Sequence, residues 1–262
     1  MTASRTPMAA LRARRQAGFT LLEMMVALTI SLVVMLGFAA TFVSMKTTFN
    51  SQSSLSQLQD NERLAMTVLT ASVGQAGYFP TGANILVTPR VAPQMMDRTA
   101  FSWSSDSVGG QMPTGTYLYG TAAGTNAESF QTGYMTSSGD GLLTCQGGTN
   151  TSGGSLLIRN VFYVQNGALG CSVLVGTAGS TTTAPGGTFV PLISGVQSMT
   201  VLYGVAGSGS QIDRYRAVGS MAAADWGNVK NVRISLQFAN PNDSTKPFTW
   251  VQNINVMNNK TL

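Results

Sequence analysis

The feature that most limits what this chain can fold into is a run of twenty uncharged, mostly apolar residues, Met24 to Val43. As an α-helix, such a run is about 30 Å long, the thickness of the hydrocarbon core of a bilayer. Lys46 is the first basic residue after the run, whereas four arginines precede it, Arg5, Arg12, Arg14 and Arg15. Because basic flanks stay in the cytoplasm, this asymmetry predicts one membrane-spanning helix with the rest of the chain outside.

Composition excludes several classes of function. The formal charge is +5, but without the four early arginines eleven basic residues face ten acidic ones, so we expect no nucleic-acid site. The absence of histidine excludes histidine-based triads and most zinc catalysis. Only 10% of the residues are charged and 29 are glycine, which indicates a loop-rich β domain joined to a hydrophobic segment.

Three kinds of export signal fit the N-terminus. One is a signal peptide cut after the apolar run, near Ala39 or Ala40, and another is a twin-arginine signal at Arg14 and Arg15. The third is a leader cut before the run. Glu23 favours the third, because an acidic residue at the head of an apolar helix is costly without a function. The alternative is that Glu23 lies at headgroup level and is only tolerated.

The residues around Glu23, RRQAG followed by FTLLEMMVALTISLVVM, resemble the type IV prepilin signature. This resemblance implies that prepilin peptidase cuts after Gly18 on the cytoplasmic face and that Phe19 becomes the N-methylated terminus. It also implies that Glu23 pairs with the terminal amine of a neighbouring subunit in the filament core, where two unpaired charges are costly.

The helix is expected to continue well beyond the membrane. Apolar residues recur near helical spacing as far as Val73, and no proline occurs before Pro80, which predicts one helix from Phe19 to Val73. The expected domains are a cleaved leader 1–18, a transmembrane and filament-core helix 19–45, an amphipathic continuation 46–75, and a periplasmic β-rich head 76–262.

The C-terminal third predicts an antiparallel sheet. Short β-branched or alternating segments are separated by Gly, Asn and Pro turns, with no helical pattern between them. The expected strands are Ser155–Gln165, Met199–Val205, Val232–Phe238 and Phe248–Val256. Residues 81–154 are interpreted as surface loops with a few short strands. The predicted class is α+β, with a long N-terminal helix packed on an antiparallel β-sheet head, as in type IV pilins.

The two cysteines, Cys145 and Cys171, flank the first of these strands. In an exported domain they most simply form one disulfide, which would contribute about 3 kcal/mol in the chain-entropy model. The alternative is two buried free thiols.

A second resemblance, to the minor pilin family called PilW, covers the C-terminal part. The residues that carry it are Val196, Met199, Val201, Tyr203 and Gly204, then Asp213 and Tyr215, then Trp226, then Val232 to Leu236, with Asn160 to Val164 followed by Cys171. The family implies a low-abundance subunit that primes assembly and ends near the filament tip. Its implied partners are prepilin peptidase, other minor pilins, the major pilin, a tip adhesin and the inner membrane.

Other functions remain as alternatives. A minor pseudopilin of type II secretion shares the leader and helix, and a membrane-tethered receptor predicts no cleavage at Gly18. An enzyme would have to use Glu128, Asp140 or Asp213, but no two of these share a motif, and Asp213 has too few acidic neighbours for calcium. We therefore expect no catalytic, cofactor or metal site.

Overall fold

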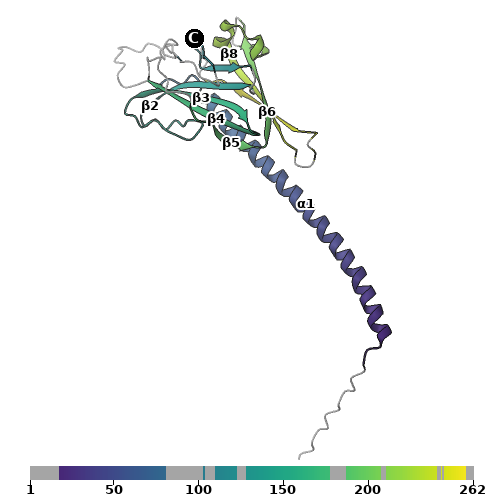
Figure 1. Ribbon diagram of the computed structural model, residues 1–262. Helices are drawn as coiled ribbons and strands as arrows, with labels where there is room; N and C mark the ends of the chain where they lie inside the picture. The colour runs from purple at the N-terminus through teal and green to yellow at the C-terminus, as the bar shows by residue number, and fades with distance from the viewer. Residues whose placement is uncertain are drawn as a thin grey trace, which may run out of the picture. The chain divides into compact units, whose positions relative to one another are not determined.

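The computed structural model describes residues 18–80, 103, 110–122, 128–177, 187–207, 211–240, 243 and 245–257 (Figure 1). The expected leader therefore lies outside the described residues, except for Gly18. The chain divides into two compact units, residues 1–52 and 53–262.

One long helix, α1 (Leu21–Gln75), runs through the end of the first unit into the second. It has 55 residues, as predicted, shifted by two residues towards the C-terminus. Proline is absent from it, so no backbone donor is lost along its length. It ends where Gly77 adopts a φ of 75°, a conformation that glycine reaches without steric cost.

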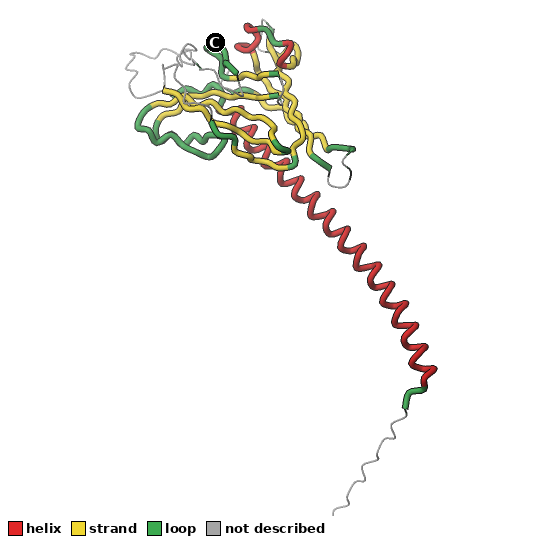
Figure 2. Tube along the Cα trace, in the orientation of Figure 1, coloured by secondary structure: helices red, strands yellow, loops and turns green. Residues whose placement is uncertain are grey.

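The second unit holds two antiparallel sheets, which Figure 2 draws in yellow. The first sheet has the strand order β1-β2-β3-β4-β5. Its strands are β1 (Leu118–Thr121), β2 (Ser129–Ser137), β3 (Ser155–Gln165), β4 (Ala168–Thr177) and β5 (Val190–Ser194). Each strand pairs with the next one along the chain, so the sheet is a meander.

The second sheet has the order β7-β6-β8-β9. Its strands are β6 (Val196–Ala206), β7 (Ile212–Ala217), β8 (Val229–Phe238) and β9 (Phe248–Asn255). Two short 3-10 helices, η2 (Val218–Ser220) and η3 (Ala223–Asn228), connect β7 to β8.

The two sheets are joined at one residue, because only Gly195 separates β5 from β6. Gly195 has a φ of 80°, which lets the chain turn out of one sheet and into the other. Its N–H donates to Gly167 O at 2.9 Å, in the turn between β3 and β4, and its carbonyl accepts from Ala239 N at 2.8 Å, just after β8. The corner is therefore hydrogen-bonded to both sheets.

The main hydrophobic core of the second unit includes residues of α1 and of both sheets. The last turns of α1 contribute Leu58, Ala65, Leu69 and Val73, which recur at helical spacing and are buried. They pack in one cluster with residues of both sheets, including Phe130, Phe162, Leu169, Ile193, Tyr203, Ile234 and Leu236.

The structure confirms the predicted α+β class. Within residues 81–154, interpreted as surface loops with a few short strands, the described part contains β1 and β2, and β2 lies inside the first sheet and is buried along almost its whole length. A strand that is covered on both faces has no reason to alternate apolar and polar residues, so its sequence carries no period-two signal.

Candidate functional site

The N-terminus of α1 is closed by a cap that lies next to the expected cleavage point. Thr20 precedes the first helical residue, and its Oγ1 accepts a hydrogen bond from the Glu23 N–H at 3.3 Å. Thr20 O also accepts from Met24 N at 3.2 Å, as the first bond of the helix. Thr20 is thus the N-cap, and Glu23 is at the third helical position, where an acidic side chain complements the helix dipole.

Gly18 and Phe19 lie just outside this cap, in a segment that is neither helix nor strand. Both are exposed, and a Cβ added to Gly18 would meet no atom within 4 Å. A protease binds its substrate extended, so the cap leaves the Gly18–Phe19 bond accessible, while the helix begins only at Leu21. Among the described residues no basic group pairs with the Glu23 carboxylate.

Among the described residues, none covers the apolar part of α1. Every described residue from Gly18 to Asn50 is exposed, including large apolar side chains such as Leu36 and Phe38. In the described part of the chain, α1 is the one helix long and apolar enough to cross a bilayer, with a mean hydropathy of 2.4 over its most apolar window. This surface requires lipid or other helices around it.

The hydroxyl groups within the apolar run are satisfied by the helix itself. Thr29 donates to Val26 O and Ser31 to Leu28 O, both at 2.9 Å, while Thr41 donates to Phe38 O at 2.8 Å. A polar group without a hydrogen bond costs on the order of several kcal/mol in hydrocarbon. The hydrogen bonds from these hydroxyls to backbone carbonyls of the preceding turn avoid that cost. The helix can therefore stay in an apolar environment despite its three hydroxyls.

The structure joins Cys145 and Cys171 in a disulfide with Cα atoms 6.4 Å apart. Cys145 belongs to the connection between β2 and β3, and Cys171 lies in β4. The neighbouring Gln146 donates from Nε2 to Cys171 O at 3.1 Å and to Thr188 O at 3.0 Å. The connection is therefore fixed against the first sheet by a covalent bond and by hydrogen bonds to two different segments.

A cleft of about 430 Å³ lies between this connection and the sheet. Its lining includes the apolar residues Leu156, Ile158 and Val175 together with hydroxyl and amide side chains such as Thr136, Gln146 and Asn150. The one titratable lining residue among those described is Tyr134, whose hydroxyl donates to Leu143 O at 3.0 Å. Burial, followed by the nearby Asp140 carboxylate, raises the pKa of Tyr134 well above its ordinary value. The cleft has no group suited to acid–base catalysis near neutral pH.

Glu128, one of the acidic residues considered for catalysis, lies between the two sheets. It precedes β2, is half-buried, and its Oε1 accepts from Val201 N in β6 at 3.4 Å. Burial raises the pKa of Glu128, although the Val201 hydrogen bond opposes this shift. Burial and the nearby Glu128 charge raise the pKa of Tyr203, which is fully buried. Glu128 thus links the sheets.

Asp140 and Asp213, the other acidic candidates, lie elsewhere. Asp140 is exposed in the turn after β2, where it accepts from the Thr136 hydroxyl and the Ser137 and Leu142 amides. Partial burial raises its pKa, but these three hydrogen bonds outweigh that effect and the net pKa is lowered. Asp213 is exposed on β7. Among the described residues no three His, Cys, Asp or Glu side chains are grouped so that they could hold a metal ion.

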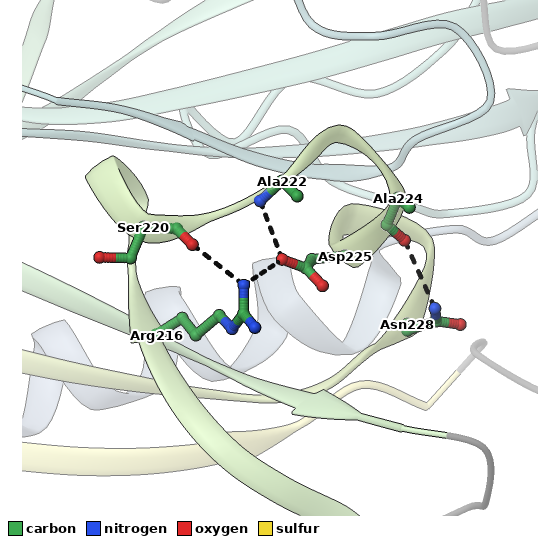
Figure 3. Close-up of polar contacts among 6 residues, drawn as sticks. All are labelled: Arg216, Ser220, Ala222, Ala224, Asp225 and Asn228. Atoms are coloured by element: carbon green, nitrogen blue, oxygen red, sulfur yellow. Dashed lines mark hydrogen bonds and ion pairs between the residues drawn. The ribbon is translucent and has the colours of Figure 1, made fainter.

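Motif residues of the second sheet have structural roles. Figure 3 shows Arg216 between Ser220 and Asp225; its Nη1 lies 3.1 Å from Ser220 O and 2.7 Å from Asp225 Oδ2. Asp225 also accepts from Ala222 N at 2.8 Å, so one carboxylate fixes the connection between β7 and β8. This connection places Trp226 in the core, with ring centroids 4.7 Å from Tyr119 and 4.8 Å from Tyr203.

The role of Thr20 is the main feature of this site that the sequence reading missed. The signal was present, because Thr20-Leu21-Leu22-Glu23 has the spacing of a capping box ahead of an apolar run. The prepilin-like motif contains the same four residues, so the motif masks the capping signal.

Two family models match this chain. The model described as type IV pilus-assembly protein W matches residues 161–259, and the prokaryotic N-terminal methylation motif matches residues 13–39. The first match includes β6 to β9, and the second includes Gly18, Phe19, Glu23 and much of the apolar run. Both resemblances stated from the sequence are therefore confirmed.

Solved structures of pilin-type proteins are also similar to this chain. One is the binary complex of two pseudopilins from the type 2 secretion system of Vibrio vulnificus, at 7% identity and a TM-score of 0.43, covering 79% of this chain and 99% of that chain. Another is a type IV-like pilin from Thermus thermophilus, at 13% identity and a TM-score of 0.40, covering 76% and 95% respectively. No curated protein sequence matches the chain.

Proposed function

We propose that this chain, which matches the type IV pilus-assembly protein W model over residues 161–259 and the N-terminal methylation motif over residues 13–39, is a minor pilin of a type IV pilus. It is cut by prepilin peptidase between Gly18 and Phe19 and N-methylated at Phe19. It then primes assembly with other minor pilins and lies at or near the filament tip.

One observation supports this proposal most strongly, namely the position of the helix cap relative to the methylation motif. The motif spans residues 13–39, and the Thr20 cap separates an exposed, non-helical Gly18–Phe19 bond from the apolar helix. Cutting ahead of the helix retains the anchor, whereas cutting after an apolar run removes it. An anchored subunit is what a filament drawn from a membrane requires.

The cap also supports the proposed role of Glu23. After cleavage the α-amine of Phe19 lies one residue before the N-cap, at the positive end of the helix dipole, where a cation is disfavoured. A carboxylate from another subunit would relieve this, and Glu23 lies on an exposed part of the helix. In a filament core of low dielectric each charge stabilises the other.

The proposed domains follow from this function. The leader is 1–18, the anchor and filament-core helix is 19–45, the amphipathic continuation is 46–75, and the head is 76–262, periplasmic before assembly and at the cell surface afterwards. Neither family match favours the alternative, a minor pseudopilin of type II secretion.

The test is processing of the full chain in a bacterium that has a prepilin peptidase. We expect Gly18→Val to leave the precursor uncut on a gel, because a β-branched residue replaces glycine at the cleavage point. Gly37→Val is the matched control, because Gly37 also has open space around its Cα and lies in the anchor. Mass spectrometry of the wild-type protein should find N-methylated Phe19; a terminus beyond residue 39 would contradict the proposal.

A further inference from the structure

The free edge of β9 differs from the other sheet edges in the described chain. An edge strand exposes unpaired N–H and C=O groups, and proteins protect such edges with charge, proline, bulges or short strands. β1 has only four residues. β5 contains Pro191 and pairs with β4 through a register shift. β7 carries Asp213, Arg214 and Arg216 and also has a register shift.

None of these protective features is present in β9. Its eight residues, FTWVQNIN, include no charge and no proline, and they pair with β8 in an unbroken register from Phe238↔Phe248 to Asn231↔Asn255. Within the described residues no strand pairs with its outer side. The strand is therefore regular, and its outer side is open among the described residues.

Apolar side chains occur on both faces of this edge. Phe248 projects to the core side of the sheet and Val251 to the opposite side, and they are 38% and 40% exposed. Trp250, on the core side, is only partly buried. An added strand would cover apolar surface on both faces while it pairs the backbone.

The charge around the edge indicates the chemistry of such a strand. β8 and β9 together contain two cations, Lys230 and Arg233, and no carboxylate. Arg233 is exposed beside Asn253 of β9, on the same face, and among the described residues no carboxylate forms an ion pair with it. A complementary strand carries apolar residues and an acidic residue that faces Arg233.

We propose that the β9 edge accepts an extended, apolar strand with an acidic residue, from the head of another pilin-type subunit of the same filament. This inference rests on the proposed function, which brings heads of such subunits together. Main-chain hydrogen bonds along β9 bind the strand, and Phe248, Val251 and Arg233 select it.

The first experiment compares two edges of one sheet in the full chain in its native membrane. Val251→Lys adds a charge to the open edge, and Ile212→Lys adds the same charge to β7, where Ile212 is also β-branched and 37% exposed. We expect Val251→Lys to lower co-purification with other pilin-type subunits at least about tenfold, the effect of 1.4 kcal/mol. Ile212→Lys and the uncharged Val251→Thr should behave as wild type. Equal association of both lysine variants, or equal loss in both, overturns the proposal.

A second measurement tests the proposal without Val251→Lys, in case that variant fails to fold. A photo-crosslinking residue at position 249, 251 or 253 should join successive residues of one extended segment in a filament subunit, whereas one at 212 should not. Crosslinks scattered over several surfaces, or none, overturn the proposal. If the wild-type chain itself binds no pilin-type subunit, the proposed function fails as well. If the wild-type chain binds but the β9 variants and crosslinks have no effect, only the inference about β9 fails.

Discussion

The ring of Tyr215 lies over Gly204 on the neighbouring strand. The two residues are cross-strand partners, and a Cβ added to Gly204 would lie 3.2 Å from Tyr215 Cε1. Tyr215 reaches across this glycine, and its hydroxyl donates to Asn231 Oδ1 at 3.0 Å on the next strand. Asn231 in turn donates from Nδ2 to Asn255 Oδ1 at 2.7 Å, so a row of contacts crosses all four strands of the sheet.

Replacing Gly204 by alanine should destabilise the head. The new Cβ would lie 3.2 to 3.3 Å from side-chain atoms of Ile212, Tyr215 and Asn231, so these would have to shift. We expect a loss of roughly 1–2 kcal/mol in the free energy of unfolding, typical of overpacking. Thermal unfolding of the detergent-solubilised full chain measures this. Gly219→Ala is the control, because a Cβ there meets no atom within 4 Å; an equal effect in both variants would contradict the explanation.

Removing the disulfide should loosen the connection between β2 and β3. We expect the double variant Cys145→Ser, Cys171→Ser to lose about 3 kcal/mol of stability, since the unfolded chain gains the entropy that the 26-residue separation constrained. Limited proteolysis should then cut between residues 138 and 154, where the wild type resists. A reductant should lower the stability of the wild type by a similar amount and leave the double variant unchanged; insensitivity of the wild type would refute this.

Two substitutions of Glu23 separate its charge from its place in the helix cap. Glutamine is accepted at the third helical position of a capping box but carries no charge. We expect both Glu23→Gln and Glu23→Ala to be processed, and both to lower the fraction of mature subunit in sheared filaments at least about tenfold, because a buried amine loses its partner. Normal incorporation of Glu23→Gln would mean that Glu23 acts only through the cap.

The stability of the head should depend on pH through Glu128. The unfolded carboxyl titrates at its ordinary pKa of 4.5, and burial raises the pKa of the folded one, so the folded state keeps the proton to higher pH. Ionised Glu128 therefore costs stability above the folded pKa, and this cost disappears as the pH falls through the folded pKa towards 4.5. Glu128→Gln still accepts from the Val201 amide without titrating. It should be more stable than wild type at pH 7 and equal to it below about pH 4.

Asp140 should affect the pH dependence of stability in the opposite direction to Glu128. Its folded pKa is lowered below the ordinary value of 3.8, so its stabilising effect is present above that pH and is lost as the pH falls through the folded pKa. Asp140→Asn should be less stable than wild type at pH 7, and the difference should close in acid. The measurement is the free energy of unfolding as a function of pH. If the curves of the wild type and of one variant run parallel, the carboxyl replaced in that variant does not contribute to the pH dependence of stability.

Strands marked by alternation or by a run of β-branched and apolar residues could be predicted from the sequence, and strands without either signal could not. β3 has the predicted bounds, and β8 and β9 differ from the prediction by a few residues at one end, because alternation and β-branched residues mark them. β2 lacks alternation and β7 contains three charges, so neither is among the strands expected from the sequence. Tertiary packing, which single-sequence patterns do not contain, decides both cases.

Some features of the candidate site could likewise be predicted from the sequence, and others could not. Gly18, Phe19 and Glu23 could be named because the methylation motif, which matches residues 13–39, is a short stretch of local sequence. The cysteine pair could be named because the chain has only two. The β9 edge could not, since a free edge is a property of strand order. Nothing in FTWVQNIN shows whether one neighbour or two will pair with it.

The glycine corner between β5 and β6 has a mechanical consequence. Asn61, on α1, donates from Nδ2 to Ser194 O at 3.1 Å, one residue before Gly195. A pull on the helix therefore reaches the joint between the two sheets directly, as well as the core in which α1 packs against both sheets. Tension would load the head as one body, so it should yield in a single cooperative step.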